Sequence, residues 1–332
     1  MEYVEIETPL GLESLTAQAL TAGGLKVMSI GKQHLQTDTF APFMHDLRGA
    51  IAVYRVLAFP VTRPKALLGH EHFKRLIRLV KDVKASYVFQ TLKLSAAGED
   101  STVMQRLRHE IATAVGLEAD QNGGDMLIRV RPSAARTAWE VLIRTTPRPL
   151  ATREWRTNNM EGALNACVAY GMASLCQLTE RDTLLNVCCG SGTLLVESQP
   201  FAVQHRFGVD NAAYALAYAQ QHLQNGHADA LLVCADATAL PFAKETFSAF
   251  LGDLPFGQLV GDARANERLY PAILQEMWRV ARRGARAVLI THAIRTMEQS
   301  LGRVATLWKT ERVLMTSLNG LHPRLYVLVK QP

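Results

Sequence analysis

The stretch Thr183-Leu-Leu-Asn-Val-Cys-Cys-Gly-Ser-Gly-Thr193 is the best guide to the fold class. Its first half is an apolar run, typical of a buried strand, and its second half is a glycine-rich turn. A strand that passes through such a turn into a helix lets a ligand approach the backbone closely. The stretch therefore favours an α/β domain that binds a nucleotide-like ligand. Glycine loops are common, so the rest of the sequence must support this interpretation.

Strands and helices alternate after this stretch. We expect strands at 206–210, 230–234, 247–252 and 285–291, and helices at 212–225, 267–282 and 293–307. Two β-rich runs, 310–317 and 324–330, flank Asn319-Gly320, a dipeptide typical of tight hairpin turns. The alternation predicts an α/β fold with a mostly parallel, doubly wound, Rossmann-like sheet that ends in an antiparallel C-terminal hairpin.

The first half of the chain lacks this alternation. Strands are expected at 3–8, 87–94, 125–131 and 137–144, and helices at 11–22 and 101–115. Pro147-Arg-Pro-Leu150 is typical of a linker, and a helix is expected from about 158 to 178. We therefore divide the chain into an α+β region, residues 1–147, a linker with its leading helix, residues 148–180, and a second domain, residues 181–332.

The composition excludes several protein classes. Hydrophobic residues make up 48% of the 332 residues and charged residues 20%, which is typical of globular proteins. No apolar run is long enough to span a bilayer, and the N-terminus lacks a signal-peptide pattern. Five cysteines without a CxxC pair are typical of reduced cytosolic thiols, so we expect a cytoplasmic protein with no metal site and no membrane partner.

Positive charge is concentrated in the first half. Residues 1–156 carry 21 Lys and Arg against 16 Asp and Glu, whereas the remainder carries 15 against 14. An anionic partner is therefore expected to contact the first half. The main candidates for phosphate contacts lie beside the linker, at Arg148, Arg153 and Arg156. Weaker candidates, each equally typical of a solvated surface, are Lys81, Lys84, Arg129, Arg131 and Arg144.

Three acidic residues follow the predicted strands. Asp210 lies 20 residues after Gly190, where an acid can accept hydrogen bonds from ribose hydroxyls or can cap the next helix. Asp236 follows the third strand, where it can accept from an adenine amino group. Asp253 ends the fourth strand and should face the same crevice, because ligands gather at the carboxyl ends of the strands. These positions fit either NAD or S-adenosylmethionine (SAM).

The motif Asp253-Leu-Pro-Phe-Gly257 separates these two ligands. Together with the glycine loop, Asp210 and Cys234-Ala-Asp236, it resembles SAM-dependent methyltransferases that act on exocyclic amino groups. Within that class it is similar to the THUMP-domain tRNA guanine-N2 methyltransferases. The resemblance covers about residues 150–332 well and the first half weakly, where Gly11-Leu-Glu-Ser-Leu15 resembles the family's opening segment and 85–144 would form a divergent THUMP module.

This resemblance implies a SAM-dependent RNA methyltransferase that acts on N2 of a guanosine in tRNA. Asp253 and the carbonyl of Leu254 would accept hydrogen bonds from the target amine, Pro255 would fix the backbone, and Phe256 would stack on the base. The residues implied for SAM binding are Asn186, Cys188, Gly190, Gly192, Thr193, Asp210, Asn211, Asp236, Ala237 and Asp253. Asn186 departs from the family, which usually has an acid there.

Several alternatives stay open at this point. The same motif serves methyl transfer to rRNA guanine, DNA adenine or cytosine, or a protein glutamine. An inactive RNA-binding protein built on a methyltransferase scaffold is a further hypothesis, and Asn186 favours it. A nicotinamide oxidoreductase would have no use for the Asp-Leu-Pro-Phe motif. The sequence also leaves open the modified nucleotide, the number of methyl groups, the oligomeric state and the need for an accessory subunit.

Overall fold

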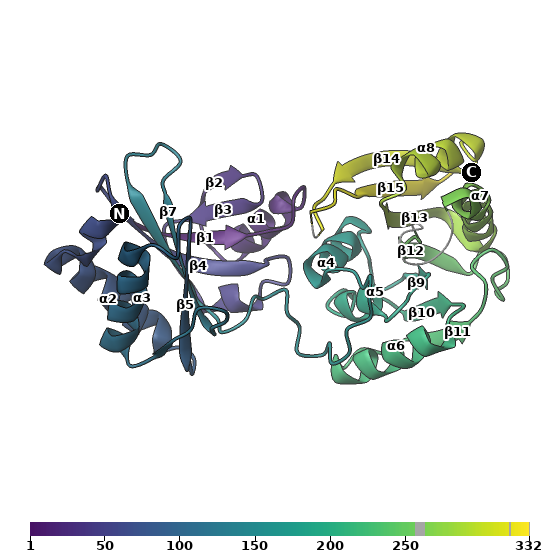
Figure 1. Cartoon of the computed structure of the whole chain (residues 1–332). Helices are drawn as coiled ribbons and strands as arrows, with labels where there is room; N and C mark the ends of the chain where they lie inside the picture. Colours follow the sequence, from purple (N-terminus) through teal and green to yellow (C-terminus); the bar gives the residue numbers. More distant parts are fainter. Residues whose placement is uncertain (256–262, 319, 332) are drawn as a thin grey trace. The chain divides into compact units, whose positions relative to one another are not determined.

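The computed structural model of the chain describes residues 1–255, 263–318 and 320–331 (Figure 1). It forms two compact units: Met1–Thr8 with Glu13–Ala151, and Pro9–Leu12 with Thr152–Pro332. Phe256 and Asn319, named above for base stacking and for the hairpin turn, lie outside the described residues. Within the described ranges, no helix has both the length and the apolar character that crossing a bilayer requires.

The second unit is built on a seven-stranded sheet of order β11-β10-β9-β12-β13-β15-β14 (Figure 1). The first five strands in this order run parallel, and β15 runs antiparallel to both of its neighbours. This topology confirms the predicted doubly wound sheet with its antiparallel terminal hairpin. The strands are β9 (Thr183–Val187), β10 (His205–Asp210), β11 (Leu231–Cys234), β12 (Phe247–Asp253), β13 (Ala281–Thr291), β14 (Trp308–Met315) and β15 (Arg324–Lys330).

Five helices of the described residues cover this sheet. On one face lie α4 (Ala166–Leu175), α5 (Thr193–Glu197) and α6 (Ala213–Asn225), and on the other α7 (Ala263–Val280) and α8 (Ile294–Arg303) (Figure 1). The alternation of buried side chains along β9 explains this arrangement, because Leu185 and Val187 join the core cluster formed with α7 and α8.

The leading helix is shorter than the sequence predicts. It was expected from about residue 158, but α4 begins at Ala166, where the Asn165 side chain accepts hydrogen bonds from the backbone N–H groups of Cys167 and Val168. Gly162 has φ +79°, which no right-handed helix contains. Residues 158–165 are therefore irregular, and this gives them a role in the site described below.

An aromatic chain anchors the strand that carries Asp253. Phe247 and Phe250 of β12 make edge-to-face contacts with the rings of Phe207, Phe242 and Trp308, with centroids 4.9 to 6.1 Å apart. Phe247 and Phe250 are fully buried. Aromatic pairs of this geometry contribute beyond their buried area, so the position of β12 is fixed by dense packing below the site.

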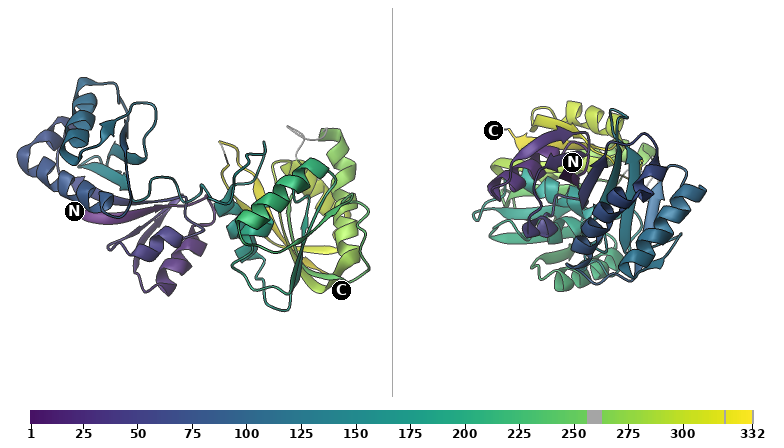
Figure 2. Two further views of the ribbon diagram at one scale, coloured as in Figure 1. Left: turned by 90° about the horizontal axis from the view of Figure 1, so that it is seen from below. Right: turned by 90° about the vertical axis from the view of Figure 1, so that its left-hand side faces the viewer.

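The first unit is an α+β structure with an eight-stranded sheet of order β2-β3-β1-β4-β8-β7-β5-β6. The helices α2 (His70–Lys84) and α3 (Thr102–Val115) lie side by side (Figure 2), and α1 is Glu13–Ala22. The sequence did not predict β2, β3, β4 or α2. The strands are β1 (Glu2–Glu7), β2 (Val27–Gly31), β3 (His34–Thr37), β4 (Ala52–Phe59), β5 (Thr91–Ala96), β6 (Glu118–Ala119), β7 (Met126–Pro132) and β8 (Trp139–Arg144).

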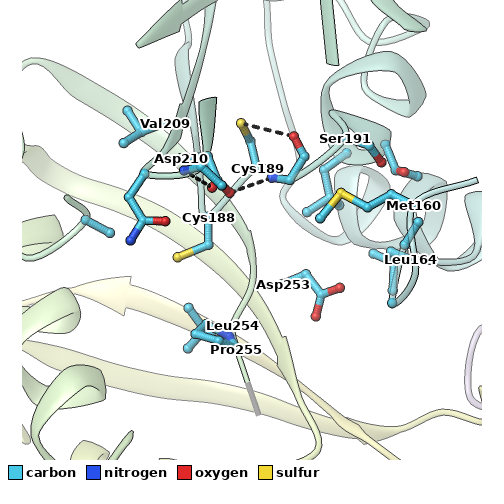
Figure 3. Close-up of a pocket in the computed structure, with 18 of the residues that line it drawn as sticks. Met160, Leu164, Cys188, Cys189, Ser191, Val209, Asp210, Asp253, Leu254 and Pro255 are labelled. Carbon is cyan, nitrogen blue, oxygen red and sulfur yellow. Dashed lines mark hydrogen bonds between the residues drawn. The ribbon is translucent and has the colours of Figure 1, made fainter. Parts of the chain in front are cut away.

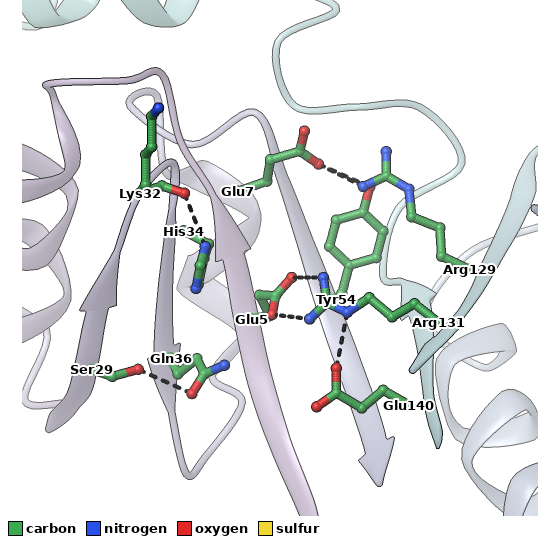
Figure 4. A network of polar contacts seen from close by, with 10 residues as sticks. All are labelled: Glu5, Glu7, Ser29, Lys32, His34, Gln36, Tyr54, Arg129, Arg131 and Glu140. Carbon is green, nitrogen blue, oxygen red and sulfur yellow. Dashed lines mark hydrogen bonds and ion pairs between the residues drawn. The ribbon is translucent and has the colours of Figure 1, made fainter. Parts of the chain in front are cut away.

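Alternate residues of β4 face two different environments. Leu57 and Phe59 pack with α2 and α3, whereas Tyr54 and Val56 belong to a cluster made of strand residues alone. This second face carries a network of ion pairs (Figure 4). Its members are Arg131 with Glu5 and Glu140, at 2.6 and 2.9 Å, and Arg129 with Glu7, at 3.0 Å.

Most of the dispersed phosphate candidates are engaged within the first unit. Arg129 and Arg131 pair with glutamates as described, Arg144 is buried and donates to the backbone carbonyls of Thr146, Asp125 and Pro147, and Lys84 donates to Val115 O. Lys81 is exposed on α2. Burial makes Arg144 a poor candidate for a phosphate contact, whereas the side chains of Arg129 and Arg131 are 42% and 44% exposed, and their contact with RNA stays a prediction.

Replacing Arg131 tests the energetic weight of this network. We expect Arg131→Met to lower the free energy of unfolding by about 2 kcal/mol, because the mostly buried carboxylates of Glu5 and Glu140 lose their partner. The matched variant Arg129→Met should cost less than about 1 kcal/mol, because Glu7 is more exposed and also accepts from the Tyr54 hydroxyl. Urea unfolding measures both, and equal losses would contradict this ranking.

Candidate active site

A pocket of about 370 Å³ opens at the carboxyl ends of β9, β10, β11 and β12 (Figure 3). This is the crevice where open parallel sheets bind their ligands. Its wall is largely apolar with a few carboxylates, a composition typical of small-molecule sites. The predicted site residues that line it are Cys188, Gly190, Thr193, Asp210, Asn211, Asp236, Ala237, Asp253, Leu254 and Pro255.

The glycine loop is held in a left-handed conformation. Gly190 has φ +50° and Gly192 φ +77°, and Cys188 between strand and loop has φ +52°, which is unusual for a residue with a side chain. Gly190 lines the pocket and faces Met160, whose Cε would lie 3.8 Å from a Cβ added to the glycine. A side chain at position 190 would thus enter the space that the pocket leaves open for a ligand.

Asp210 is oriented by the backbone on both sides. Its Oδ2 accepts from the Gly190 N–H at 2.8 Å and its Oδ1 from the Ala212 N–H at 2.9 Å. The carboxylate therefore both fixes the glycine loop and caps the turn before α6, and each oxygen retains a lone pair for a ligand hydroxyl. Asp210 thus holds the turn that leads into α6, and its contact with a ribose stays a prediction.

The environment of Cys188 shows how closely the acids converge. Burial first, and then the carboxylates of Asp210, Asp253 and Asp236, together raise the pKa of its thiol to about 12. Cys188 therefore stays protonated, and all five cysteines are free thiols. The three acids predicted from three different strands surround one loop.

Asp253 has an unusual environment for a carboxylate. It ends β12 and lies between Cys188 and the side of the pocket formed by Met160 and Leu164 (Figure 3). Burial raises the pKa of Asp253 to about 7, because the apolar surroundings disfavour the charged form. A carboxyl group that titrates near neutral pH in a cleft is a candidate for a functional role.

The backbone after Asp253 is held by a chain of hydrogen bonds. The Tyr270 hydroxyl donates to the Pro255 carbonyl at 2.6 Å, and the Asn266 amide donates to the same oxygen at 3.0 Å. Tyr270 also bonds to the Thr291 hydroxyl at 2.6 Å, which accepts from the Ala293 N–H. Because burial raises the pKa of Tyr270, its hydroxyl remains a donor, and α7 fixes the segment that follows the acid.

Residues 160–164, which we call the strap, close one side of the pocket. Arg156 anchors the strap by donating to Leu164 O at 2.8 Å and to the Thr193 hydroxyl at 2.9 Å. Arg153 lies nearby and pairs at 2.8 Å with Glu197, which is fully buried and also accepts from the Trp155 indole.

Two of the three linker arginines are thus structural. The Arg153 side chain is only 11% exposed, and Arg156 is half-buried between the strap and α5. Their expected contacts with RNA phosphates do not fit these positions. Arg148 is exposed. The sequence could not separate these cases, because the buried partner Glu197 lies 44 residues from Arg153.

Two residues implied for cofactor binding do not line the pocket. Asn186 is fully buried in β9, and its amide donates to Leu251 O at 3.1 Å, so it links two strands. Gly192 begins α5 and packs against α6, where an added Cβ would lie 3.0 Å from Cβ of Ala219. Conversely, the sequence interpretation missed the strap and the α7 residues Asn266, Leu269 and Ile273.

A family of methyltransferase domains, UPF0020, described as RMKL-like, matches residues 153–322. The chain belongs to this family. The match includes the strap, the glycine loop and β12, so the pocket described above lies within the RMKL-like methyltransferase domain. The resemblance predicted from the glycine loop and the Asp253 motif is confirmed.

Curated relatives share the methyltransferase domain. The tRNA (guanine(6)-N(2))-methyltransferase THUMP3 of Mus musculus is 29% identical over 184 residues, which cover 50% of this chain and 36% of the relative. The U6 snRNA (guanine-N(2))-methyltransferase THUMPD2 of Mus musculus is 31% identical over 148 residues, which cover 43% of this chain and 26% of the relative. The chain therefore spans only about a third of the length of the first relative and about a quarter of the second.

Solved structures share the fold along the whole chain. TrmN from Thermus thermophilus has a TM-score of 0.78 at 19% identity, with 100% of both chains covered. SMU.472, a putative methyltransferase complexed with SAH, has a TM-score of 0.70 at 15% identity and covers 100% of this chain and 99% of its own. The methyltransferase domain and the α+β unit before it thus occur together in other proteins.

The pKa of Asp253 makes the stability of the methyltransferase domain depend on pH. Since the folded pKa of about 7 exceeds the unfolded value of 3.8, the folded state holds the proton more tightly, and stability falls as pH rises toward and through 7. We expect the free energy of unfolding to fall by about 1 kcal/mol between pH 6 and pH 8 through this group. Urea unfolding at both pH values measures it. In Asp253→Asn this component of the fall should disappear, and an unchanged fall would assign it to other groups.

Proposed function

We propose that this chain is a SAM-dependent RNA methyltransferase that modifies the exocyclic N2 amine of a guanosine in tRNA. The observation that carries the proposal is the carboxyl group of Asp253, placed in an apolar pocket at the tip of β12 beside a backbone that α7 holds in place. The guanine-N2 methyltransferases among the relatives support the choice of substrate.

The pocket fits the cofactor that the family implies. Asp210 offers one lone pair from each carboxylate oxygen to two ribose hydroxyls, and Asp236 with Ala237 lies beside it at the end of β11. Gly190 leaves open the space that a side chain would fill. SAM supplies an electrophilic methyl group when bound. The residues that would hold it are Cys188, Gly190, Thr193, Asp210, Asn211, Asp236 and Ala237.

The chemistry required of the protein is modest. The lone pair of a guanine N2 amine is delocalised into the ring, so the amine must be positioned rather than strongly deprotonated. Asp253 and the Leu254 carbonyl would accept hydrogen bonds from the two N–H groups of the amine and would orient its nitrogen toward the methyl group. The same carboxylate would take the proton released after transfer, which its pKa of about 7 permits at neutral pH.

The target base must leave its helix to reach this pocket. Bases stacked in a duplex are inaccessible, so the substrate guanosine is unpaired or flipped out. We propose that the α+β region, residues 1–147, binds the RNA backbone together with the adjoining linker, since residues 1–156 carry most of the excess positive charge of the chain. The candidates for phosphate contacts are the exposed side chains Arg148 and Lys81, followed by Arg129 and Arg131, which are 42% and 44% exposed.

A labelling experiment tests this function directly. The protein is incubated with unmodified total tRNA and methyl-labelled SAM, the RNA is digested, and the labelled nucleoside is identified by mass spectrometry. Labelled N2-methylguanosine is the expected product. Label in adenosine or cytidine, or no label in RNA while SAM still binds, would overturn the proposed substrate.

Asp253→Asn should separate catalysis from cofactor binding. We expect the rate of methyl transfer to fall by roughly a hundredfold or more, because the amide cannot accept the proton and offers only one acceptor oxygen. The dissociation constant for SAM, measured by calorimetry, should change by less than about threefold, since less than about 1 kcal/mol of cofactor binding is lost.

Asp210→Ala is the matched control and should give the opposite pattern. We expect SAM affinity to fall by about tenfold or more through the loss of charge-assisted hydrogen bonds. Saturating SAM should then restore much of the transfer rate. Equal losses of binding in both variants would contradict the separate roles assigned to the two acids.

The transfer rate should depend on the ionisation of Asp253. Only the deprotonated carboxylate accepts both an amine hydrogen bond and the product proton, so activity should rise with pH up to about 7 and then level off. Below that pH, kcat/KM should fall by about tenfold per pH unit. A profile that is flat between pH 5.5 and 8 would show that Asp253 does not take part in ionised form.

A further inference from the structure

Asn266 holds an unexplained acceptor in the wall of the pocket. The residue is 1% exposed, and its amide nitrogen donates to the Pro255 carbonyl at 3.0 Å. Its Oδ1 is buried and has no hydrogen-bond partner among residues 1–255, 263–318 and 320–331. Among the pocket-lining residues that the structure describes, Asn266 alone has a buried side-chain oxygen without a hydrogen-bond partner. A buried unpaired acceptor costs free energy, so its retention calls for a ligand that donates to it.

The position of Asn266 places this acceptor at the substrate end of the pocket. Asp210 ends β10 and Asp236 follows β11 by two residues, on one side of β9 in the sheet order, whereas Asp253 ends β12 on the other side. Asn266 is bound directly to Pro255, two residues after Asp253. Its oxygen therefore belongs with the group that receives the target amine rather than with the residues that face the cofactor's adenosine.

The orientation of the Asn266 amide is fixed by chemistry. The Pro255 carbonyl is an acceptor only, so the nitrogen must face it and the oxygen must face away. A flip would bring two oxygens together. The Tyr270 hydroxyl donates to the same carbonyl and holds it in place. The atom that Asn266 offers to a ligand is therefore the acceptor Oδ1 and not the donor Nδ2.

The ring atom beside the exocyclic amine differs among the bases. In guanine the N1 atom next to the N2 amine carries a proton and donates. In adenine and cytosine the ring nitrogen next to the amine is an acceptor. An acceptor fixed beside Asp253 can therefore accept a hydrogen bond from N1–H of guanine. With adenine or cytosine it would face another acceptor with no proton between them, which disfavours these two bases.

We propose that Asn266 Oδ1 accepts the N1–H of the target guanine and is a specificity-determining residue of this site. This inference rests on the proposed function and deepens it by assigning the choice of guanine over other amines. Asp253 and Leu254 then bind the amine, and Asn266 reads the neighbouring ring atom. Three acceptors from β12 and α7 together match the three donor hydrogens on the Watson–Crick edge of guanine.

The test compares guanosine with 2-aminopurine at the nucleotide that the wild-type protein methylates. Both bases carry the 2-amine, but N1 of 2-aminopurine has no proton. Methyl transfer from labelled SAM is measured on a tRNA and on the same tRNA with this single replacement. We expect wild type to prefer guanosine by roughly tenfold or more, which is the effect of one unpaired buried acceptor. Asn266→Ala should reduce the preference to within about twofold, mainly by losing activity on guanosine.

Tyr270→Phe is the matched control, because it removes the other hydrogen bond to the Pro255 carbonyl and leaves the Asn266 oxygen in place. It should slow both substrates alike and keep the preference for guanosine. Since 2-aminopurine also lacks the 6-oxygen, a preference that survives in Asn266→Ala would assign the selection to that oxygen and overturn the proposal. Calorimetry adds a further criterion, because a large loss of SAM affinity in Asn266→Ala would make the residue a cofactor contact.

The measurement on the wild-type protein can refute the proposal by itself, even if the variants do not fold. Equal transfer to the two bases would refute a contact with N1–H while leaving guanine-N2 methylation intact. Absence of transfer to any guanosine would instead overturn the proposed function, and the inference with it. The two failures are thus distinguishable in one assay.

Discussion

The register of the parallel strands is the constraint on which the site depends. Gly252 of β12 pairs with Val187 of β9, and Val209 of β10 pairs with the same valine on the other side. These pairings bring the chain ends after residues 187, 210 and 253 to one edge. Asp210 also pairs with Cys234 of β11, which brings the segment with Asp236 to the same edge. The backbone hydrogen bonds of the parallel sheet therefore set the positions of Asp210, Asp236 and Asp253 around the pocket.

The site combines rigid backbone with one adaptable charge. The left-handed glycine loop, the capping by Asp210 and the hydrogen bonds to the Pro255 carbonyl fix the walls. Asp253 stands among them with its pKa raised to about 7 by burial. Burying a carboxylate costs free energy, and acids in such surroundings are common at functional sites.

One buried ion pair and one hydrogen bond attach the wall of the pocket to the rest of its unit. Arg153 with Glu197, and Arg156 with the Thr193 hydroxyl, hold the irregular segment before α4 against α5. A segment without helical hydrogen bonds needs such partners, because its backbone groups would otherwise be unpaired. The same two residues look like surface cations in the sequence, which is why a charge count alone misassigned them.

The sequence by itself determined the alternating strands, the glycine loop and the acids at three strand ends, because these depend on local periodicity and on turn chemistry. It also pointed to the methyltransferase family through the Asp253 motif. Only the tertiary structure decided which residues line the pocket. Asn186 bonds to the neighbouring strand β12 and Gly192 packs against α6, whereas the strap and Asn266 line the pocket. Packing between segments far apart in the chain sets these directions, and no local pattern records it.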